Sequence, residues 1–279
     1  MSSGQKIIKY LAMAFAVGLA FSIISSIFYG VMMFTEIMDF KDTYIDDENT
    51  YIDEDVKLEE ISSIEFSNLD IEIMGSSLVI KEGDSYNVET NNKYIKAKNK
   101  GNTLYIEENE HSYFKRVKDS KVIITIPSSS KLNDVSIENG AGSMNINYLN
   151  TNNLELDLGA GRVNINNLVA SNKSDIDTGA GEVIIKSSIL NNLDLDLGVG
   201  SFKMNADIRG NSTIDQGVGE VDINLIGSKN DYYITLDKGL GNAIIDGVSV
   251  NDDTNVGNGS NKIDISGGVG SIKVNFLEN

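Results

Sequence analysis

The stretch "LDLGAGRVNIN" (residues 156–166) decides the fold of this chain. It places a Gly-x-Gly pair between two runs of alternating apolar and polar residues, a pattern typical of β-strands with one buried face. The pair recurs, with its first glycine at Gly140, Gly159, Gly179, Gly198, Gly217, Gly239 and Gly268. The first five copies are 19 or 20 residues apart. This spacing is the length of one coil in a stacked repeat protein.

Each Gly-x-Gly pair is predicted to be a corner of such a coil. Apolar residues stand at odd offsets from the first glycine before and within the pair, and at even offsets after it. The alternation therefore slips by one residue at the pair, as at a bulge, where glycine tolerates the required backbone angles. The residue between the glycines is apolar in every copy and is predicted to point inward. The structural corner residues are Gly140, Gly142, Gly159, Gly161, Gly179, Gly181, Gly198, Gly200, Gly217, Gly219, Gly239, Gly241, Gly268 and Gly270.

The predicted fold is mainly β: a parallel β-solenoid (β-helix) of 19–20 residues per coil, preceded by one transmembrane α-helix. A dinucleotide-binding fold is excluded because no copy completes G-x-G-x-x-G and opens a helix. A calcium-binding β-roll of RTX type is rejected because its G-G-x-G-x-D pattern is absent. The predicted segments are a cytoplasmic N-terminus (1–9), a transmembrane signal anchor (10–34), an acidic stalk (35–60), an irregular β cap region (61–130) and the solenoid repeats (131–279).

The transmembrane prediction rests on twenty-five residues without a charge, from Tyr10 to Phe34, because about twenty apolar residues span a bilayer. Lys6 and Lys9 precede this run, so the N-terminus is expected in the cytoplasm and the C-terminal domain outside a single-pass cell-membrane protein. A row of small residues at four-residue intervals has two interpretations. Either it packs against a helix of a second copy of the chain or of another membrane protein, or it arises by chance. Its members are Ala14, Gly18, Ser22, Ser26 and Gly30.

Composition excludes several classes of function. The formal net charge of −18 argues against nucleic acid as a partner, because phosphate binding requires clustered Lys and Arg. The chain has no cysteine, which excludes disulfides and thiolate metal sites. Its one histidine, His111, lies in a polar stretch and is expected to be an ordinary exposed residue. No catalytic residue and no cofactor are predicted.

Two columns of polar residues are the candidate sites. An acidic residue usually precedes the first glycine by two positions, which predicts an outward-facing ladder of Asp157, Asp177, Asp196, Asp215 and Asp237. The ladder either binds divalent cations such as calcium, or a cationic peptide or envelope polymer, or is a solvated face that prevents aggregation. A weaker acidic column comprises Glu155, Asp175, Asp194 and Asp264. A further column is predicted to be a structural ladder, containing Asn147, Asn166, Lys186, Asn205, Asn224, Asp246 and Asn275.

The order of these features resembles that of the bacterial putative-adhesin family of β-strand-repeat proteins. The resemblance covers roughly residues 60 to 277 and is carried by "ITIPSSSKLNDVSIENGAGSMNI" and the repeats "LDLGAGRVNI" and "IDQGVGEVDINL". This family is a domain of unknown function that includes LiaG-like membrane-anchored cell-envelope proteins. The resemblance implies a solenoid at the cell envelope and brings no catalytic residues.

The predicted function is therefore a membrane-anchored, extracytoplasmic and non-enzymatic interaction, adhesion or envelope-stress module. One alternative is a scaffold that polymerises end to end, because the C-terminal "GVGSIKVNFLEN" would leave an open strand edge. The other is a polysaccharide-active β-helix enzyme, which requires long insertions that form a cleft and basic residues near the acids.

Overall fold

The structure, a computed structural model, describes residues 58–109 and 119–278. These residues form sixteen β-strands and a short 3-10 helix, which confirms the prediction of a mainly β protein. The elements are β1 (Glu59–Ser62), β2 (Asn68–Ile73), β3 (Ser77–Gly83), β4 (Asn87–Thr90), β5 (Ile95–Lys100), β6 (Thr103–Glu108), β7 (Lys121–Pro127), β8 (Leu132–Asn191), β9 (Leu193–Arg209), β10 (Asn211–Ile226), η2 (Lys229–Asp231), β11 (Tyr232–Asp237), β12 (Leu240–Ile245), β13 (Val248–Val250), β14 (Thr254–Gly257), β15 (Asn261–Ser266) and β16 (Val269–Leu277).

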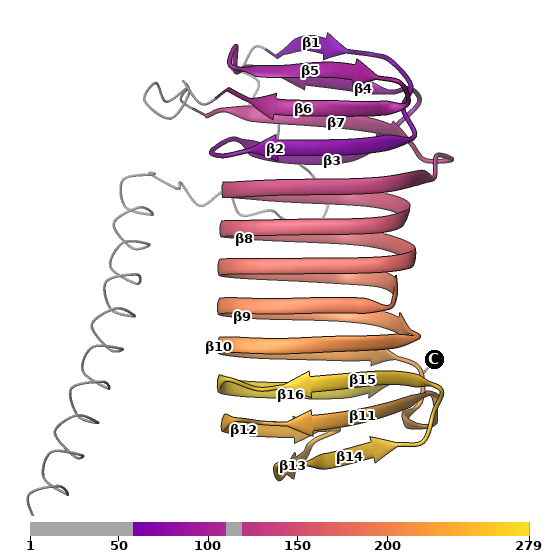
Figure 1. The fold of residues 1–279 in the computed structure, drawn as a ribbon, viewed down its shortest axis with the longest axis vertical. Helices are drawn as coiled ribbons and strands as arrows, with labels where there is room; N and C mark the ends of the chain where they lie inside the picture. Colours follow the sequence, from indigo (N-terminus) through magenta and orange to yellow (C-terminus); the bar gives the residue numbers. More distant parts are fainter. Residues whose placement is uncertain (1–57, 110–118, 279) are drawn as a thin grey trace, which may run out of the picture. The chain divides into compact units, whose positions relative to one another are not determined.

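Successive coils of the chain lie on top of one another and pair in parallel (Figure 1). Strand β8 continues through three coils, and β9 and β10 are the next two. The pairing keeps equivalent positions together: Gly181 lies beside Gly200, and Gly200 beside Gly219. We call these stacked coils the coil stack.

The buried side chains follow the alternation that the sequence predicts on both sides of each corner. In one coil, Leu156 and Leu158 are buried before the glycine pair, and Val163 and Ile165 are buried after it. The offset of the buried positions therefore changes from odd to even at the pair. A third run of alternating burial begins at Leu168, beyond a polar corner at 166–167.

The second glycine of a stacked corner is required by both conformation and space at Gly161, Gly181, Gly200, Gly219 and Gly270. Gly200 has a φ of +145°, which L side chains rarely adopt. A Cβ placed on Gly200 would lie 1.9 Å from the backbone oxygen of Gly181 in the coil beneath. Only a residue without a side chain lets two corners stack this closely.

The residue between the two glycines points outward, so the prediction that it faces the core is wrong. Val199, Val269 and Leu240 are 40%, 47% and 77% exposed. At the corner the chain turns within the glycine pair, and the middle side chain projects from the outer edge of the turn. We call this column the apolar ridge; its members are Ala141, Ala160, Ala180, Val199, Val218, Val269 and Leu240.

The C-terminal coil does not lie at the end of the stack. Strand β15 pairs with β10 on one side and β11 on the other, and β16 lies between β10 and β12. The coil formed by β15 and β16 is therefore inserted between two coils that precede it in the sequence (Figure 1). The spatial order of the last three coils differs from their order along the chain.

Short antiparallel strands close both ends of the described stack. At one end β13 pairs antiparallel with β12, and β14 pairs antiparallel with β11. At the other end β4 pairs antiparallel with β7 and β1, and β5 pairs antiparallel with β6. The expectation that the C-terminal strand leaves an open edge is wrong, because β16 has a parallel partner on each side. This removes the basis of the end-to-end polymerising alternative.

A two-residue turn starts the C-terminal cap. Asp246 and Gly247 join β12 to β13 and have φ angles of +51° and +75°. Positive φ at both central residues is the requirement of a type I′ hairpin, and Asp-Gly is a preferred pair for it. Asp246 therefore serves the hairpin, although the sequence assigns it to the asparagine column.

The predicted single-pass localisation is contradicted. Within residues 58–109 and 119–278, no helix is long and apolar enough to cross a membrane. The predicted span, residues 10–34, and its packing residues Ala14, Gly18, Ser22, Ser26 and Gly30 lie outside the described residues. A membrane location with an extracytoplasmic C-terminal domain is therefore not part of the proposed function.

Candidate functional site

The predicted acidic ladder forms along the outside of the stack, directly before the corner. Asp177 pairs in register with Asp196, and Asp196 with Asp215. Asp157, Asp177, Asp196 and Asp215 are all exposed, because their inward neighbours on each strand fill the core. Adjacent rungs of a parallel sheet are about 4.8 Å apart, so the four carboxylates follow one another at that spacing.

The ladder extends further toward the N-terminal end than the repeat predicts. Glu138 in β8 pairs with Glu72 in β2, and Glu72 pairs with Glu107 in β6. Sequence reasoning missed Glu72 and Glu107, because β2 and β6 lack the Gly-x-Gly on which the copies are aligned. The sequence indicated them only in that each is an acidic residue near the end of a run of alternating apolar and polar residues. Lys98 donates a hydrogen bond to Glu107 at 2.8 Å and lowers the pKa of that carboxyl group.

At the C-terminal end the inserted coil interrupts the ladder. Ser266 lies between Asp215 and Asp237 in the register of the sheet. Asp237 is therefore two rungs away from Asp215, and its carboxylate accepts a hydrogen bond from the backbone of Gly239. Of the five predicted ladder residues, the structure brings four together and separates the fifth.

The four central carboxylates have no partner of opposite charge in the part of the chain that is described. Among the described residues, no hydrogen bond or ion pair engages Asp157, Asp177, Asp196 or Asp215. Burial raises the pKa of Asp177, and the carboxylate of Asp196 raises it further. Burial likewise raises the pKa of Asp196, followed by the effect of Asp215. The ladder therefore places negative charges at close spacing, and no lysine or arginine of residues 58–109 and 119–278 pairs with them.

The second acidic column differs, because three of its four members, Asp175, Asp194 and Asp264, have local partners. Lys173 contacts the carboxylate of Asp175 at 2.6 Å. Thr213 donates a hydrogen bond to Asp194, and Thr235 donates one to Asp264. One of these acids is paired with a lysine and two accept hydrogen bonds from threonine, so the candidate site is the first column.

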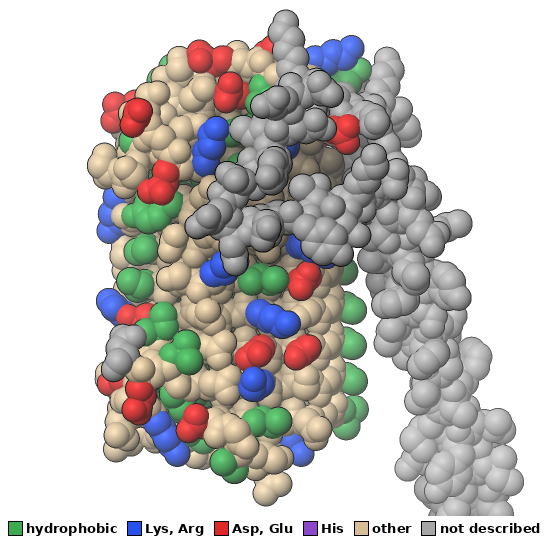
Figure 2. Space-filling model, turned by 180° about the vertical axis from the view of Figure 1, so that it is seen from behind, with side chains coloured by type: hydrophobic (Ala, Val, Ile, Leu, Met, Phe, Trp, Pro, Cys, Tyr) green, Lys and Arg blue, Asp and Glu red, His purple; other side chains and the backbone are tan. Residues whose placement is uncertain are grey.

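The four aspartates border a groove that runs along the stack. It is shallow and largely open to solvent, and its lining includes Gly159, Gly179, Gly198 and Gly217. In the sequence each of these glycines stands between a ladder aspartate and a ridge residue, and it adds no side chain to the groove. Hydrophobic side chains form a row along one edge of the molecule in the space-filling view (Figure 2). We call the groove that the four aspartates border the corner groove.

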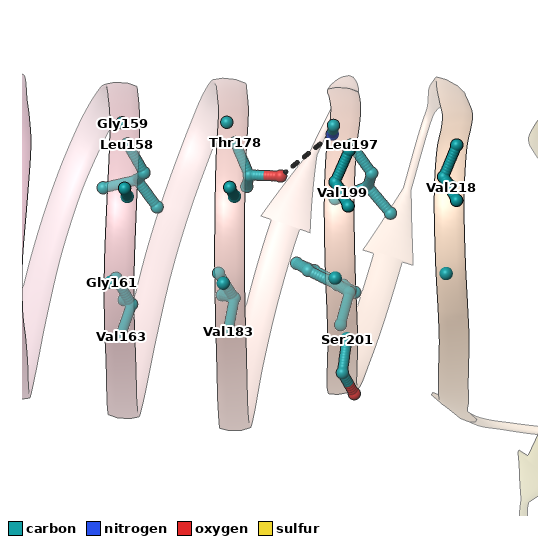
Figure 3. A pocket seen from close by; sticks show the side chains of 18 of the residues that line it. Leu158, Gly159, Gly161, Val163, Thr178, Val183, Leu197, Val199, Ser201 and Val218 are labelled. Atoms are coloured by element: carbon teal, nitrogen blue, oxygen red, sulfur yellow. Dashed lines mark hydrogen bonds between the residues drawn. The ribbon is translucent and has the colours of Figure 1, made fainter. Parts of the chain in front are cut away.

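A second hollow lies beneath the corner, inside the coils. Leu158, Thr178 and Leu197 succeed one another along it (Figure 3). Its volume is about 30 Å³, which is room for about one water molecule. Thr178 Oγ1 accepts a hydrogen bond from the backbone N–H of Gly198 at 3.4 Å. This interior space is too small for an organic ligand, which leaves the corner groove as the candidate site.

The geometry does not assemble a metal centre in the part of the chain that is described. No three Asp, Glu or His side chains of residues 58–109 and 119–278 are placed to hold one ion. The aspartates form a straight row, whereas a calcium site needs six to eight oxygens around one point. His111 lies outside the described residues.

Asparagine columns hold the coils in register at the other corners. Asn224 donates a side-chain hydrogen bond to Asn205 at 2.8 Å, and Asn275 donates one to Asn224 at 2.7 Å. A second asparagine column escaped the sequence reasoning: Asn153 donates to Asp134 at 2.8 Å, and Asn172 to Asn153 at 2.7 Å. These ladders make the stack a rigid support for the groove.

Comparisons with known proteins identify one family and several similar structures. A family model described as Toastrack DUF4097 matches residues 66–275. No curated protein sequence matches the chain. Among solved structures, a putative adhesin from Bacteroides fragilis is similar, with 19% identity, a TM-score of 0.46, and coverage of 78% of this chain and 96% of that chain.

Two further solved structures are similar at lower scores. A putative cell adhesion protein from Clostridium sporogenes has 13% identity and a TM-score of 0.31, covering 79% of this chain and 99% of its own. A putative lipid binding protein from Parabacteroides distasonis has 13% identity and a TM-score of 0.30, covering 79% of this chain and 96% of its own.

Proposed function

The chain belongs to the Toastrack DUF4097 family, and we propose that it is a β-solenoid interaction or adhesion module that holds an extended ligand in the corner groove without catalysing a reaction. The observation that carries this proposal is the row of four carboxylates beside the groove, which have no partner among the residues that the structure describes. A repeated row of one chemical group suits a ligand that is itself extended and repetitive.

The electrostatics favour a cationic ligand. Two unit charges at the rung spacing repel by about 1 kcal/mol in water, and more strongly where water is displaced. In the second column threonine or lysine relieves this repulsion, whereas the groove acids lack such partners among the described residues. A bound cation would remove the repulsion, and the rigid register would spare the ligand the cost of ordering the site.

The groove does not offer the groups that a polysaccharide-active enzyme needs. Its polar side chains are four aspartates with Thr178 and Gln216, and Gln216 already donates to the backbone oxygen of Gly219 at 2.8 Å. General acid-base chemistry needs carboxylates in two different environments, whereas these follow one repeated environment. The coils also have almost no insertions that could form a cleft around a sugar chain.

The test measures binding of charged probes to the full chain. We expect a fluorescently labelled oligolysine to bind, and oligoglutamate and neutral dextran not to bind. A groove variant changes the four ladder residues to asparagine: Asp157→Asn, Asp177→Asn, Asp196→Asn and Asp215→Asn. It should bind oligolysine at least about fourfold more weakly, because four exposed charge pairs that contribute about 0.2–1 kcal/mol each add up to at least about 0.8 kcal/mol.

The matched control removes the same charge elsewhere. Its four changes are at exposed acids away from the corner: Glu65→Gln, Asp84→Asn, Asp253→Asn and Glu278→Gln. We expect its affinity for oligolysine to stay within about twofold of the unmodified chain. Equal weakening of both variants would mean that only net charge matters, and the proposed site would be wrong.

A further inference from the structure

The apolar ridge is a hydrophobic row at the corner, exposed at Val199, Val269 and Leu240 and half-buried at its other members. Val199, Val269 and Leu240 project from the corner into solvent, and the ridge carries an apolar residue at every one of its rungs. A turn position on a soluble surface is ordinarily polar. A contiguous row of exposed and half-buried apolar side chains on the surface marks an interaction surface more often than isolated exposed residues do.

The ridge and the acidic ladder run side by side along the same corner. In each coil the ridge residue follows the aspartate by three positions, as Val199 follows Asp196 and Val218 follows Asp215. In the sequence a glycine that lines the corner groove stands between them. One ligand lying along the stack therefore meets carboxylates on one side and apolar side chains on the other.

We infer that this combined surface docks an extended, basic and amphipathic segment of a partner protein, which lies parallel to the stack axis. Its Lys or Arg side chains reach the ladder, and its apolar side chains cover the ridge. The inference rests on the proposed function and names the partner of the same site. Charge complementarity selects this occupant. A second copy would bring its own carboxylates against the ladder, and an anionic membrane would be repelled by them.

The rung spacing also selects the conformation of the segment. Two rungs advance about 9.6 Å along the axis, and one turn of polyproline II, which is three residues, advances about 9.3 Å. Two residues of a β-strand advance about 6.6 Å, which matches neither one rung nor two. A three-residue repeat in polyproline II conformation keeps its basic residues over every second aspartate and its apolar residues over every second ridge position.

The experiment uses the full chain and three labelled peptides of equal length. The alternating peptide repeats Lys-Pro-Leu four times, and the polar peptide repeats Lys-Pro-Ser four times, with the same charge and no leucine. The block peptide has the composition of the alternating peptide, with its lysines, prolines and leucines gathered into three separate runs. We expect the alternating peptide to bind about tenfold more tightly than either comparison peptide, since leucine burial on the ridge adds to the charge contacts.

A ridge variant locates the apolar contribution. The changes Val199→Thr, Val218→Thr and Val269→Thr keep the shape and the strand preference of the side chains, so the fold is retained. We expect this variant to bind the alternating and polar peptides within about twofold of each other. The matched control, Ile64→Thr with Val248→Thr, changes exposed apolar residues off the ridge and should keep the tenfold preference.

The outcomes separate this inference from the proposed function. Equal binding of the alternating and polar peptides to the unmodified chain overturns the ridge inference, while groove-dependent oligolysine binding would still support the proposed function. Loss of binding of every cationic probe overturns both. Ridge-dependent dimerisation in analytical ultracentrifugation, or ridge-dependent binding to phosphatidylglycerol vesicles, would assign the ridge to another occupant and overturn the inference.

Discussion

A single aspartate of the ladder illustrates how a residue can be unfavourable for stability and still be placed regularly by the fold. Asp177 faces solvent beside the carboxylates of Asp157 and Asp196, and no lysine or arginine among the described residues forms an ion pair with it. Substitutions of surface residues change stability little when the residue is not a helix cap, a buried polar group or a site of backbone strain. A column of like charges therefore signifies a role other than stabilising the stack.

Replacing this aspartate should stabilise the protein in a pH-dependent way. Burial and the neighbouring carboxylates raise the pKa of Asp177 in the folded state above its ordinary value of 3.8. A raised pKa means that ionisation costs folding free energy, and this cost appears as pH rises through the folded-state pKa. We expect Asp177→Asn to raise the free energy of unfolding by about 0.5 kcal/mol at pH 7.

Thermal melting at pH 7 and near pH 3 measures this effect. Near pH 3 the aspartate is protonated in both folded and unfolded chains, so the variant should have the same melting temperature as the unmodified protein. Glu65→Gln, an exposed acid outside the ladder, provides the control and should change the melting temperature at neither pH. A variant that is less stable at pH 7 would show that Asp177 has a stabilising partner.

Periodicity located the central ladder residues but not the orientation of the ridge. Asp157 and Asp196 could be predicted because a fixed offset from a glycine fixes the face of a strand. The ridge residue Val199 was predicted to be buried because it is apolar, yet apolar side chains supply much of a protein surface. At a corner with a positive φ, the direction of a side chain depends on the turn and not on its hydropathy.

The corner is the element that determines the coil. At the corners of β8, β9 and β10, the Gly-x-Gly turns the chain while the residues on both sides of it keep their pairing to the neighbouring coil. The slip of alternation could be read from the sequence, because it changes which offsets are apolar. The asparagine column at 134, 153 and 172 was missed, because its residues stand in a corner without glycine.

Adding one methyl group at a stacked corner should be strongly destabilising. In Gly200→Ala the new Cβ would lie 1.9 Å from the backbone oxygen of Gly181, at a φ of +145°. Neither backbone can move without breaking the register of the neighbouring coils. We expect a loss of about 3 kcal/mol or more in the free energy of unfolding, measured by urea denaturation.

Gly75→Ala is the matched control for this change. A Cβ at Gly75 would meet no heavy atom within 4 Å, and its φ is not in the region that excludes side chains. Its urea midpoint should therefore correspond to a change of at most about 0.5 kcal/mol. If both variants unfold at the same urea concentration, the corners do not stack as closely as the structure places them.

On the scale of the whole molecule, the repeat predicts the coils but not their order. The family resemblance predicted from the repeats is confirmed by the match over residues 66–275. The inserted position of β15 and β16 could not be derived, because every coil presents the same columns and fits on any other. Ile214, Leu236 and Ile265 occupy equivalent positions, and either stacking order buries them.

The insertion has a physical reason in the edges of the sheet. Stacking in sequence order would leave β15 and β16 as parallel edge strands with unpaired backbone groups. In the observed order, the last coil has partners on both sides, and the short antiparallel β13 and β14 form the end. Short edge strands are a common protection against aggregation.

A pair of engineered cysteines distinguishes the two stacking orders, and the absence of native cysteine keeps the result unambiguous. In the observed order Asn224 and Asn275 are neighbours in register, with their side-chain amides hydrogen-bonded at 2.7 Å. The double variant Asn224→Cys with Asn275→Cys should form an intramolecular disulfide under mild oxidation, which accelerates migration in a non-reducing gel.

The comparison pair is Asn224→Cys with Asp246→Cys, which stacking in sequence order would make neighbours. In the structure the inserted coil separates these two positions, since the backbone N–H of Asp246 donates to Val274 in that coil at 2.8 Å. Two rungs span about 9.6 Å, beyond the Cα separation of about 7 Å that a disulfide tolerates. This pair should stay reduced. A disulfide in the second pair and none in the first would mean that the coils stack in sequence order, with β16 at an open end of the molecule.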